Sequence, residues 1–383
     1  MVSMVALAAG QNGGIPPKLV AGHKRLVGEG ERNSVLNCER LAVDAMQLGC
    51  GDLAKDYLDR ALARIGAVYA DNPGAQKARS LWYEEGCKDF KGEPYERSMA
   101  YYYRGLLYLM DGDYDNGRAC FKSGVLQDAF AEEEQNRCDF ALLVFLEAWA
   151  CAALGDSDLA DAAYAELGRL RPDFLRPSAE ANVLLIVETG KSPRKLADGM
   201  GHSELKFRRG RDFSEVRARY SLDGTSSQPL YPMEDVAWQA MTRGGRQVDN
   251  ILQGKVQFRS SNERSGTVLT DIASEMLLRS PGGGSSGAVM DGVGAALGLV
   301  GVVQLALSAS TKPRADTRYW DNLPDAVHVA ALTLPAGKHD LVLSYCDASG
   351  QQVSESNVSV SIPDAGVKRI VWARSRTQLS TAK

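Results

Sequence analysis

Residue types that usually carry catalysis or metal binding are few and scattered in this chain. The 383 residues include four histidines and seven cysteines, with no CxxC pair and no two histidines at a metal-ligand spacing. No serine is expected to lie in a nucleophile elbow, and the acidic run Glu132–Glu134 falls on a polar helical surface, where solvation is its expected role. We therefore expect no catalytic residues, no bound metal and no cofactor; an undetected hydrolase is one alternative.

Two further clusters fit ligand-binding patterns only in part. The basic run Lys206–Arg211 (KFRRGR) suits phosphate or nucleic acid, but Phe207 is its only aromatic residue, which favours a solvated loop. The glycines between 282 and 298 fit neither a P-loop nor a dinucleotide fingerprint, because no Lys-Ser/Thr pair follows them. Together with a formal net charge of -4, these patterns argue against nucleic acid as a partner.

One apolar set is a candidate for binding a protein partner. Helical spacing places Met99 and Tyr102 on one face of an expected helix, and Phe145 and Trp149 on the matching face of a later one. Aromatic side chains that face a groove can anchor an extended peptide or another helix. The alternative is that this face packs against the C-terminal half of the same chain.

Small residues at fixed spacing predict the helices that position these side chains. Close crossing of two antiparallel helices requires glycine or alanine at the contact, and glycine before a polar turn ends the first helix. The matched positions are Gly105, Gly112, Gly117 and Phe121 in one copy and Ala148, Gly155, Ala160 and Tyr164 in the next, with a weaker copy over 40–62. These segments resemble tetratricopeptide repeats, although the spacing between copies is irregular.

The rest of the chain changes character after Pro172. A buried strand is expected within 182–195, a helix over 233–243, and turn-bounded antiparallel strands over 327–334, 339–346, 357–362 and 368–375. The fold class is therefore predicted to be α+β. The expected segments are a leader or truncated signal (1–33), a tetratricopeptide-like helical domain (34–178), a mixed middle segment (179–280), a glycine-rich linker with an apolar helix (281–311) and a small antiparallel β domain (312–383).

Residues 292–310 form a stretch of nineteen residues without a charge. That length approaches what a membrane span requires, and small residues at Gly294 and Gly298 suit close helix packing. We prefer a helix buried among protein neighbours or inserted shallowly, because four glycines, Gln304 and two serines interrupt the apolar run. Membrane association through this stretch stays open.

The motif before the terminal strands is a candidate interdomain junction. In Asp316-Thr317-Arg318-Tyr319-Trp320 the acid and the guanidinium can pair while the indole packs below them. As structure this is a staple between the helical and β parts. As a binding site, Arg318 and Trp320 would flank a ligand cleft.

Several stretches resemble an uncharacterised bacterial family of tetratricopeptide-containing envelope proteins. They are Ala315–Leu343, Pro94–Arg118, Leu184–Lys195 and Met241–Lys255. The resemblance implies a helical repeat domain joined to a small C-terminal β domain, in the periplasm or at the membrane. Many relatives look like lipoproteins, whereas this sequence has no lipid-accepting cysteine near its start, so a cytoplasmic location is the alternative.

The resulting functional prediction is a non-enzymatic scaffold or adaptor of the bacterial cell envelope that holds a protein partner on its helical surface. The alternative is a module that binds a glycan or peptidoglycan fragment with its β domain.

Overall fold

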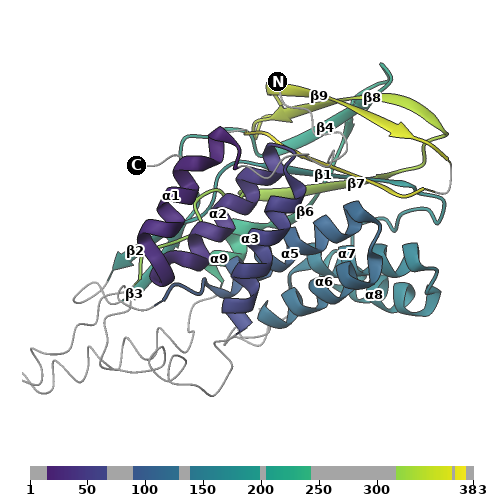
Figure 1. The fold of residues 1–383 in the computed structure, drawn as a ribbon. Coiled ribbons are helices and arrows are strands. Elements are labelled where there is room, and N and C mark those ends of the chain that lie inside the picture. Colours follow the sequence, from purple (N-terminus) through teal and green to yellow (C-terminus); the bar gives the residue numbers. More distant parts are fainter. Residues whose placement is uncertain are drawn as a thin grey trace, which may run out of the picture.

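The computed structural model describes residues 15–66, 89–128, 139–198, 204–242, 316–364 and 367–376. Its fold class is α+β, as predicted, with most helices in the N-terminal half and most strands towards the C-terminus. A helical layer lies on one side of the strands (Figure 1). The acidic run Glu132–Glu134, the glycine-rich linker and the apolar stretch 292–310 lie outside the described residues.

The helical layer consists mainly of antiparallel hairpins. Its helices are α1 (Val20–Glu29), α2 (Ser34–Gln47), α3 (Gly51–Gly66), α5 (Pro94–Asp111), α6 (Tyr114–Asp128), α7 (Ala141–Leu154) and α8 (Ser157–Leu170). Short 3-10 turns, Pro17–Leu19 and Gly30–Asn33, flank α1. α1 packs on α2 and places Leu26 in the core, so the part of the expected leader that the structure describes belongs to the fold.

Glycines set the contacts and the ends of these helices, as the sequence predicted. A Cβ atom added at Gly105 would lie 2.4 Å from Cε1 of Phe121, so only glycine permits this approach of α5 and α6. Gly112 and Gly155 adopt φ values of 80° and 81° and end α5 and α7 in the left-handed conformation typical of helix C-termini. The hairpins α5/α6 and α7/α8 therefore follow from local sequence.

The strands form two four-stranded sheets and one hairpin. The strands are β1 (Val183–Thr189), β2 (Arg194–Asp198), β3 (Glu204–Arg208), β4 (Arg217–Leu222), β5 (Gln228–Pro229), β6 (Tyr231–Asp235), β7 (Ala326–Leu332), β8 (Gly337–Cys346), β9 (Gln352–Ile362) and β10 (Arg369–Arg374), with the short helix α9 (Val236–Met241) after β6. The mixed sheet has the order β10-β1-β7-β6, the antiparallel sheet β5-β4-β8-β9, and β2 pairs with β3.

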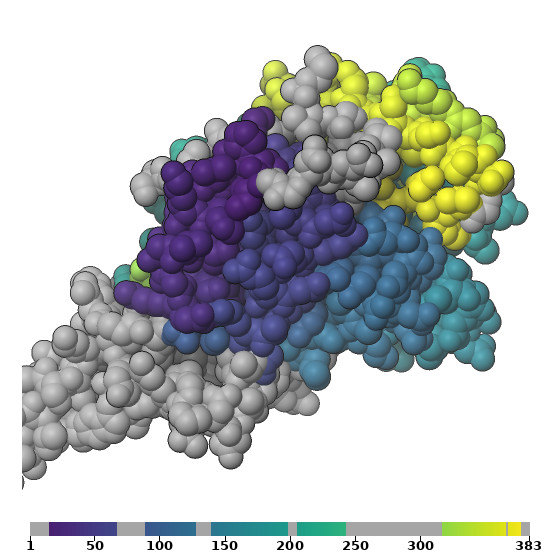
Figure 2. All heavy atoms as spheres, viewed as in Figure 1, coloured from purple at the N-terminus to yellow at the C-terminus, as the bar shows by residue number. Residues whose placement is uncertain are grey.

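The mixed sheet is the middle layer of the molecule. All seven residues of β1 are buried, and their side chains alternate between two cores. Leu184 and Ile186 join the core shared with the helices, whereas Val183 and Leu185 join the core shared with the antiparallel sheet. A continuous apolar strand is expected where a sheet is covered on both faces. In Figure 2 the purple and blue helices form one part of the surface and the yellow strands another.

The expected boundary at residue 312 does not separate a domain. β10 pairs in parallel with β1, and β8 pairs with β4, so the middle and C-terminal segments share both sheets. Alternation within a strand does not reveal its long-range partner, so this pairing across residue 312 could not be predicted from the strands alone. The four terminal strands themselves are confirmed.

Among the described residues, every helix is too short or too polar to cross a lipid bilayer.

Candidate functional site

The aromatic set predicted from the sequence lies inside the molecule. Met99, Tyr102 and Phe145 have no exposed surface, and Trp149 is 3% exposed. They share one core with residues of the mixed sheet, because burying an apolar helix face is more favourable than leaving it in water. The prediction that all four line an open groove is therefore wrong. The alternative, packing against the C-terminal half of the same chain, describes the structure.

A buried carboxylate joins α5 to the mixed sheet. Glu188 on β1 is 1% exposed, and the hydroxyl groups of Tyr102 and Tyr103 donate to it at 3.1 and 2.9 Å. The Trp372 indole N–H donates at 2.9 Å, and the Arg374 guanidinium pairs with it at 2.9 Å. Burial, with the nearby carboxylate, raises the pKa of both tyrosines well above the usual value, which keeps them protonated as donors. This cluster holds layers together and leaves no acceptor free for a ligand.

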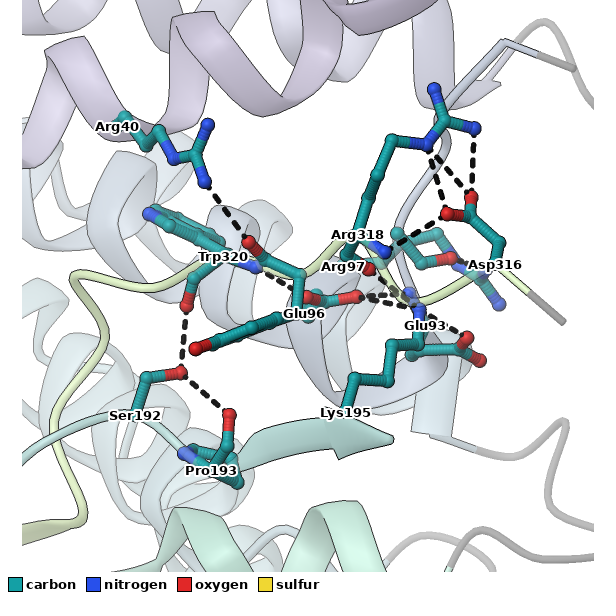
Figure 3. A network of polar contacts seen from close by, with 12 residues as sticks. Arg40, Glu93, Glu96, Arg97, Ser192, Pro193, Lys195, Asp316, Arg318 and Trp320 are labelled. Carbon is teal, nitrogen blue, oxygen red and sulfur yellow. Dashed lines mark hydrogen bonds and ion pairs between the residues drawn. The ribbon is translucent and has the colours of Figure 1, made fainter. Parts of the chain in front are cut away.

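A second polar cluster surrounds residues 316–325, which we call the strap. The strap is an extended segment that leads into β7, and in Figure 3 it runs between the helices and β2. The main chain of Trp320 is held on both sides. Its N–H donates to Glu96 Oε1 at 2.7 Å, and Ser192 Oγ donates to its carbonyl at 2.7 Å.

Glu96 belongs to the capping box that begins α5. Its Oε2 accepts from the Glu93 N–H at 2.7 Å, while Oε1 holds the strap. Lys195 on β2 contacts the Glu93 carboxylate at 2.6 Å and donates to the Arg318 carbonyl at 3.0 Å. Burial is the largest influence on Glu96 and raises its pKa, although the ammonium of Lys195 opposes this. One helix start, one hairpin and the strap are thus joined (Figure 3).

The strap contains the junction residues named from the sequence. Arg318 pairs with Asp316 at 2.7 Å and donates to Asn33 Oδ1 at 2.6 Å. Trp320 has no exposed surface, and its indole N–H donates to Asn322 Oδ1. Because the ring is enclosed, Arg318 and Trp320 do not flank an open ligand cleft. Their contacts are those of a staple.

One buried acid near the strap lacks a hydrogen-bond partner among the described residues. Glu39 on α2 has no exposed surface, and neither of its carboxyl oxygens is bonded. Burial, followed by the proximity of Glu96, raises its pKa well above the usual value. Burial thus disfavours the charged form of Glu39, which lies in the interior of the molecule.

Within the basic run 206–211, one arginine forms ion pairs and other basic side chains are exposed. Arg209 bridges Asp235, at 2.6 Å, and Asp325, which begins the turn into β7. Burial raises the pKa of Asp325 to about 6, and Arg209 opposes that shift. Arg208 and Arg211 are exposed at the surface, but residues 206–208 belong to strand β3 and not to the expected loop.

A pocket of about 200 Å³ lies at the end of the helical layer, beside α7 and α8. Its lining combines small residues, two aromatic rings, two cations and two hydroxyl groups. The lining residues are Trp149, Ala152, Gly155, Ser157, Ala160, Tyr164, Arg176, Pro177, Ser178, Ala179, Ala181 and Lys368. Thus Trp149, although almost fully buried, forms part of an accessible hollow.

The two cations of the pocket each lie over an aromatic ring. The Lys368 ammonium is 5.3 Å from the Trp149 ring centroid, and the Arg176 guanidinium is 4.6 Å from that of Tyr164. Arg176 also pairs with Asp161 at 2.6 Å, but both side chains are more than half exposed. Burial lowers the pKa of Lys368; its ammonium donates to the Ala181 carbonyl but has no ion-pair partner among the described residues. The pocket therefore holds one cation without a counter-ion.

The histidines offer no metal site in the part of the chain that the structure describes, where no group of metal-ligating side chains gathers. His328 on β7 is 1% exposed, with Nε2 at 3.0 Å from Thr189 Oγ1. Burial lowers its pKa to about 4, so it is neutral at physiological pH.

Comparisons with protein-family models, with curated proteins and with solved structures returned no match.

Sequence reasoning missed most of the residues that define these clusters. In the sequence, Lys195 is only the last residue of the stretch Leu184–Lys195, and no pattern distinguishes Glu96, Glu188 or Lys368 from a solvated charge. The one usable signal was local. Glu93 and Glu96 stand three residues apart before an apolar helix, which is the spacing of a capping box.

Proposed function

We propose that this protein is a non-catalytic scaffold that binds a partner protein at the pocket beside α7 and α8. The observation that carries the proposal is the composition of that pocket: Lys368, a half-buried cation with no counter-ion among the described residues, lies over the Trp149 ring. A carboxylate from a partner would supply the missing charge at low cost, because the lysine is already partly desolvated.

The lining further specifies the partner. Ala152, Gly155 and Ala160 are small residues that leave room for an incoming side chain, and Tyr164 adds an aromatic wall. Ser157 and Ser178 supply hydroxyl groups. This chemistry suits an acidic peptide segment that also carries an apolar side chain.

Arg176 can contribute to the same contact. Its ion pair with Asp161 is exposed, and pairs of this kind contribute about 0–1 kcal/mol, so its guanidinium can change partner at little cost. Binding through Lys368 would weaken at a lower pH than for an ordinary lysine, because burial lowers the pKa of its ammonium.

Photo-crosslinking tests the proposal. Benzoylphenylalanine in place of the exposed Ala152 should capture a discrete partner in cells, and Lys368→Glu should abolish the capture. Lys338→Glu, at an exposed lysine on β8, is the matched control and should leave capture unchanged. Equal capture by the wild-type chain and the Lys368→Glu variant would contradict the proposal.

The resemblance to envelope proteins supports a partner in the bacterial envelope. Cell fractionation with the full-length chain tests this part separately, and recovery only with cytoplasmic markers would overturn it.

A further inference from the structure

β9 is the edge strand of the antiparallel sheet, which can be followed in Figure 1. It is eleven residues long and pairs on one side with β8; among the described residues its other side has no backbone partner. Edge strands are usually protected by proline, lysine or a bulge that prevents further pairing. The sequence of β9, QVSESNVSVSI, contains no proline and no basic residue; its pairing with β8 shifts register at Val353 and is regular from Ser354 onwards.

The hydrogen-bond pattern shows which backbone groups face outwards. The N–H of Asp223, next to the end of β4, donates to the Asp340 carbonyl at 2.9 Å, so Asp340 on β8 faces β4. Because the direction of the backbone groups alternates along β8, the N–H and C=O groups of Leu341 and Leu343 point towards β9. Their partners on β9 are Val358 and Ser356, so the backbone N–H and C=O groups of these two residues bond to β8.

The intervening residues of β9 therefore present their N–H and C=O groups to the open side. They are Glu355, Asn357 and Ser359. Glu355 and Asn357 are exposed, and Val353 at the start of the strand is 47% exposed, so this edge is accessible over the first half of β9.

We propose that β9 is a homodimer interface at which a second copy of this chain adds its own β9 in antiparallel orientation, with the two-fold axis at Asn357. The two antiparallel sheets then form one continuous sheet across the axis. About six inter-chain backbone hydrogen bonds form, two for each of three hydrogen-bonded residue pairs.

Side-chain complementarity selects a second copy and this register. With the axis at Asn357, the two Asn357 amides face each other and can exchange hydrogen bonds. Glu355 then lies opposite Ser359 of the second copy, an uncharged residue whose hydroxyl donates to Asp340 Oδ1 of its own chain. An axis at Glu355 would instead place two carboxylates directly opposite each other, which is unfavourable. Glu355 is the only charged residue of β9, so in this register no two charges of the paired strands lie directly opposite each other.

The first test is the oligomeric state of the full chain by sedimentation velocity over a concentration series. The wild-type chain should form dimers, and Asn357→Pro should raise the dissociation constant at least tenfold, because proline removes the outward N–H and leaves the bonds to β8 in place. Asn357→Ala keeps that N–H and should remain largely dimeric. A monomeric wild-type chain at all concentrations would overturn the proposal, as would an equally stable dimer of Asn357→Pro.

Cross-linking provides a second measurement that does not depend on proline being tolerated. Asn357→Cys places two thiols at the axis and should form a disulfide-linked dimer under mild oxidation. Ser349→Cys, in the β8–β9 turn, places the two thiols far apart and should not cross-link. Cross-linking at 349 but not at 357 would exclude this register. These positions lie on β9 and its turn and are not part of the pocket lining. A loss of dimerisation can therefore be distinguished from a loss of partner capture.

Discussion

The strap and the pocket are both places where charged side chains meet aromatic rings, yet they differ in whether a carboxylate neutralises the lysine. Around the strap, the N–H and C=O groups of Trp320 are both bonded and Lys195 contacts a carboxylate. In the pocket, Lys368 has no ion-pair partner and the Trp149 indole N–H has no hydrogen-bond partner among the described residues.

This difference separates a structural role from a binding role. Removing one member of a bonded buried cluster leaves the others unsatisfied, and that cost appears as lost stability. A partly desolvated cation without a counter-ion has the opposite property, because a ligand can improve its environment. The clusters at Glu188 and the strap should therefore respond to mutation through folding, and the pocket through binding.

The largest effect is expected at the buried carboxylate. Glu188→Ala leaves the Arg374 guanidinium buried without its partner and should lower the free energy of unfolding by about 3–5 kcal/mol. Urea denaturation monitored by circular dichroism measures this. Glu188→Gln retains hydrogen-bond acceptance and should cost less; a loss below about 1 kcal/mol for the alanine variant would show that the cluster is not a structural hub.

A smaller, pH-dependent effect is expected at His328. Its folded pKa of about 4 lies below the unfolded value of 6.5, so the unfolded state binds more protons between these values and stability falls as pH falls through that window. The loss from pH 7 to pH 5 should be about 2 kcal/mol.

His328→Gln should reduce that slope in denaturation curves recorded at several pH values. Asp325 acts with the opposite sign, because its raised pKa makes the folded state bind more protons, and Asp325→Asn should steepen the loss on acidification. Identical slopes for the two variants would contradict these assignments.

The exposed rim of the strap should matter less than its buried part. Asp316 pairs with Arg318 at a partly exposed position, and Asp316→Ala should cost about 0.5–1 kcal/mol in unfolding free energy. Trp320→Ala, measured beside it, should cost several times more because it empties a fully buried site. Equal losses would remove the distinction between rim and interior.

The smallest effect on stability is expected in the pocket. Arg176→Ala breaks an exposed ion pair and should change the free energy of unfolding by less than about 0.5 kcal/mol. The same variant should reduce capture of the partner by the photo-crosslinker at Ala152. A large loss of stability would place Arg176 among the structural residues instead.

The helices could be predicted closely because their signals are local. Each signal is steric and lies within one hairpin. Gly105 makes room for Phe121, and Gly112 and Gly155 allow the left-handed conformation that ends a helix. The terminal strands were also predictable from alternation, since one face of each packs on a core. The pairing of β10 with β1 was not, because nothing within either strand encodes a partner far along the chain.

The candidate site was predictable only in pieces. Asp316 and Arg318 are two residues apart, and their pairing could be expected from the sequence alone. Lys368 meets Trp149 only because β10 returns to the helical layer, and Glu188 meets Trp372 for the same reason. No periodicity within a segment contains that information.

The amino-acid sequence by itself determined where helices and strands form and which glycines allow two helices to touch, because dihedral preference and steric fit act within a few residues. Only the tertiary structure decided that the aromatic face of α5 and α7 is covered by the mixed sheet, and which charged side chains among the described residues meet a carboxylate. Those outcomes depend on contacts between distant segments, whose energies arise only after the chain has folded.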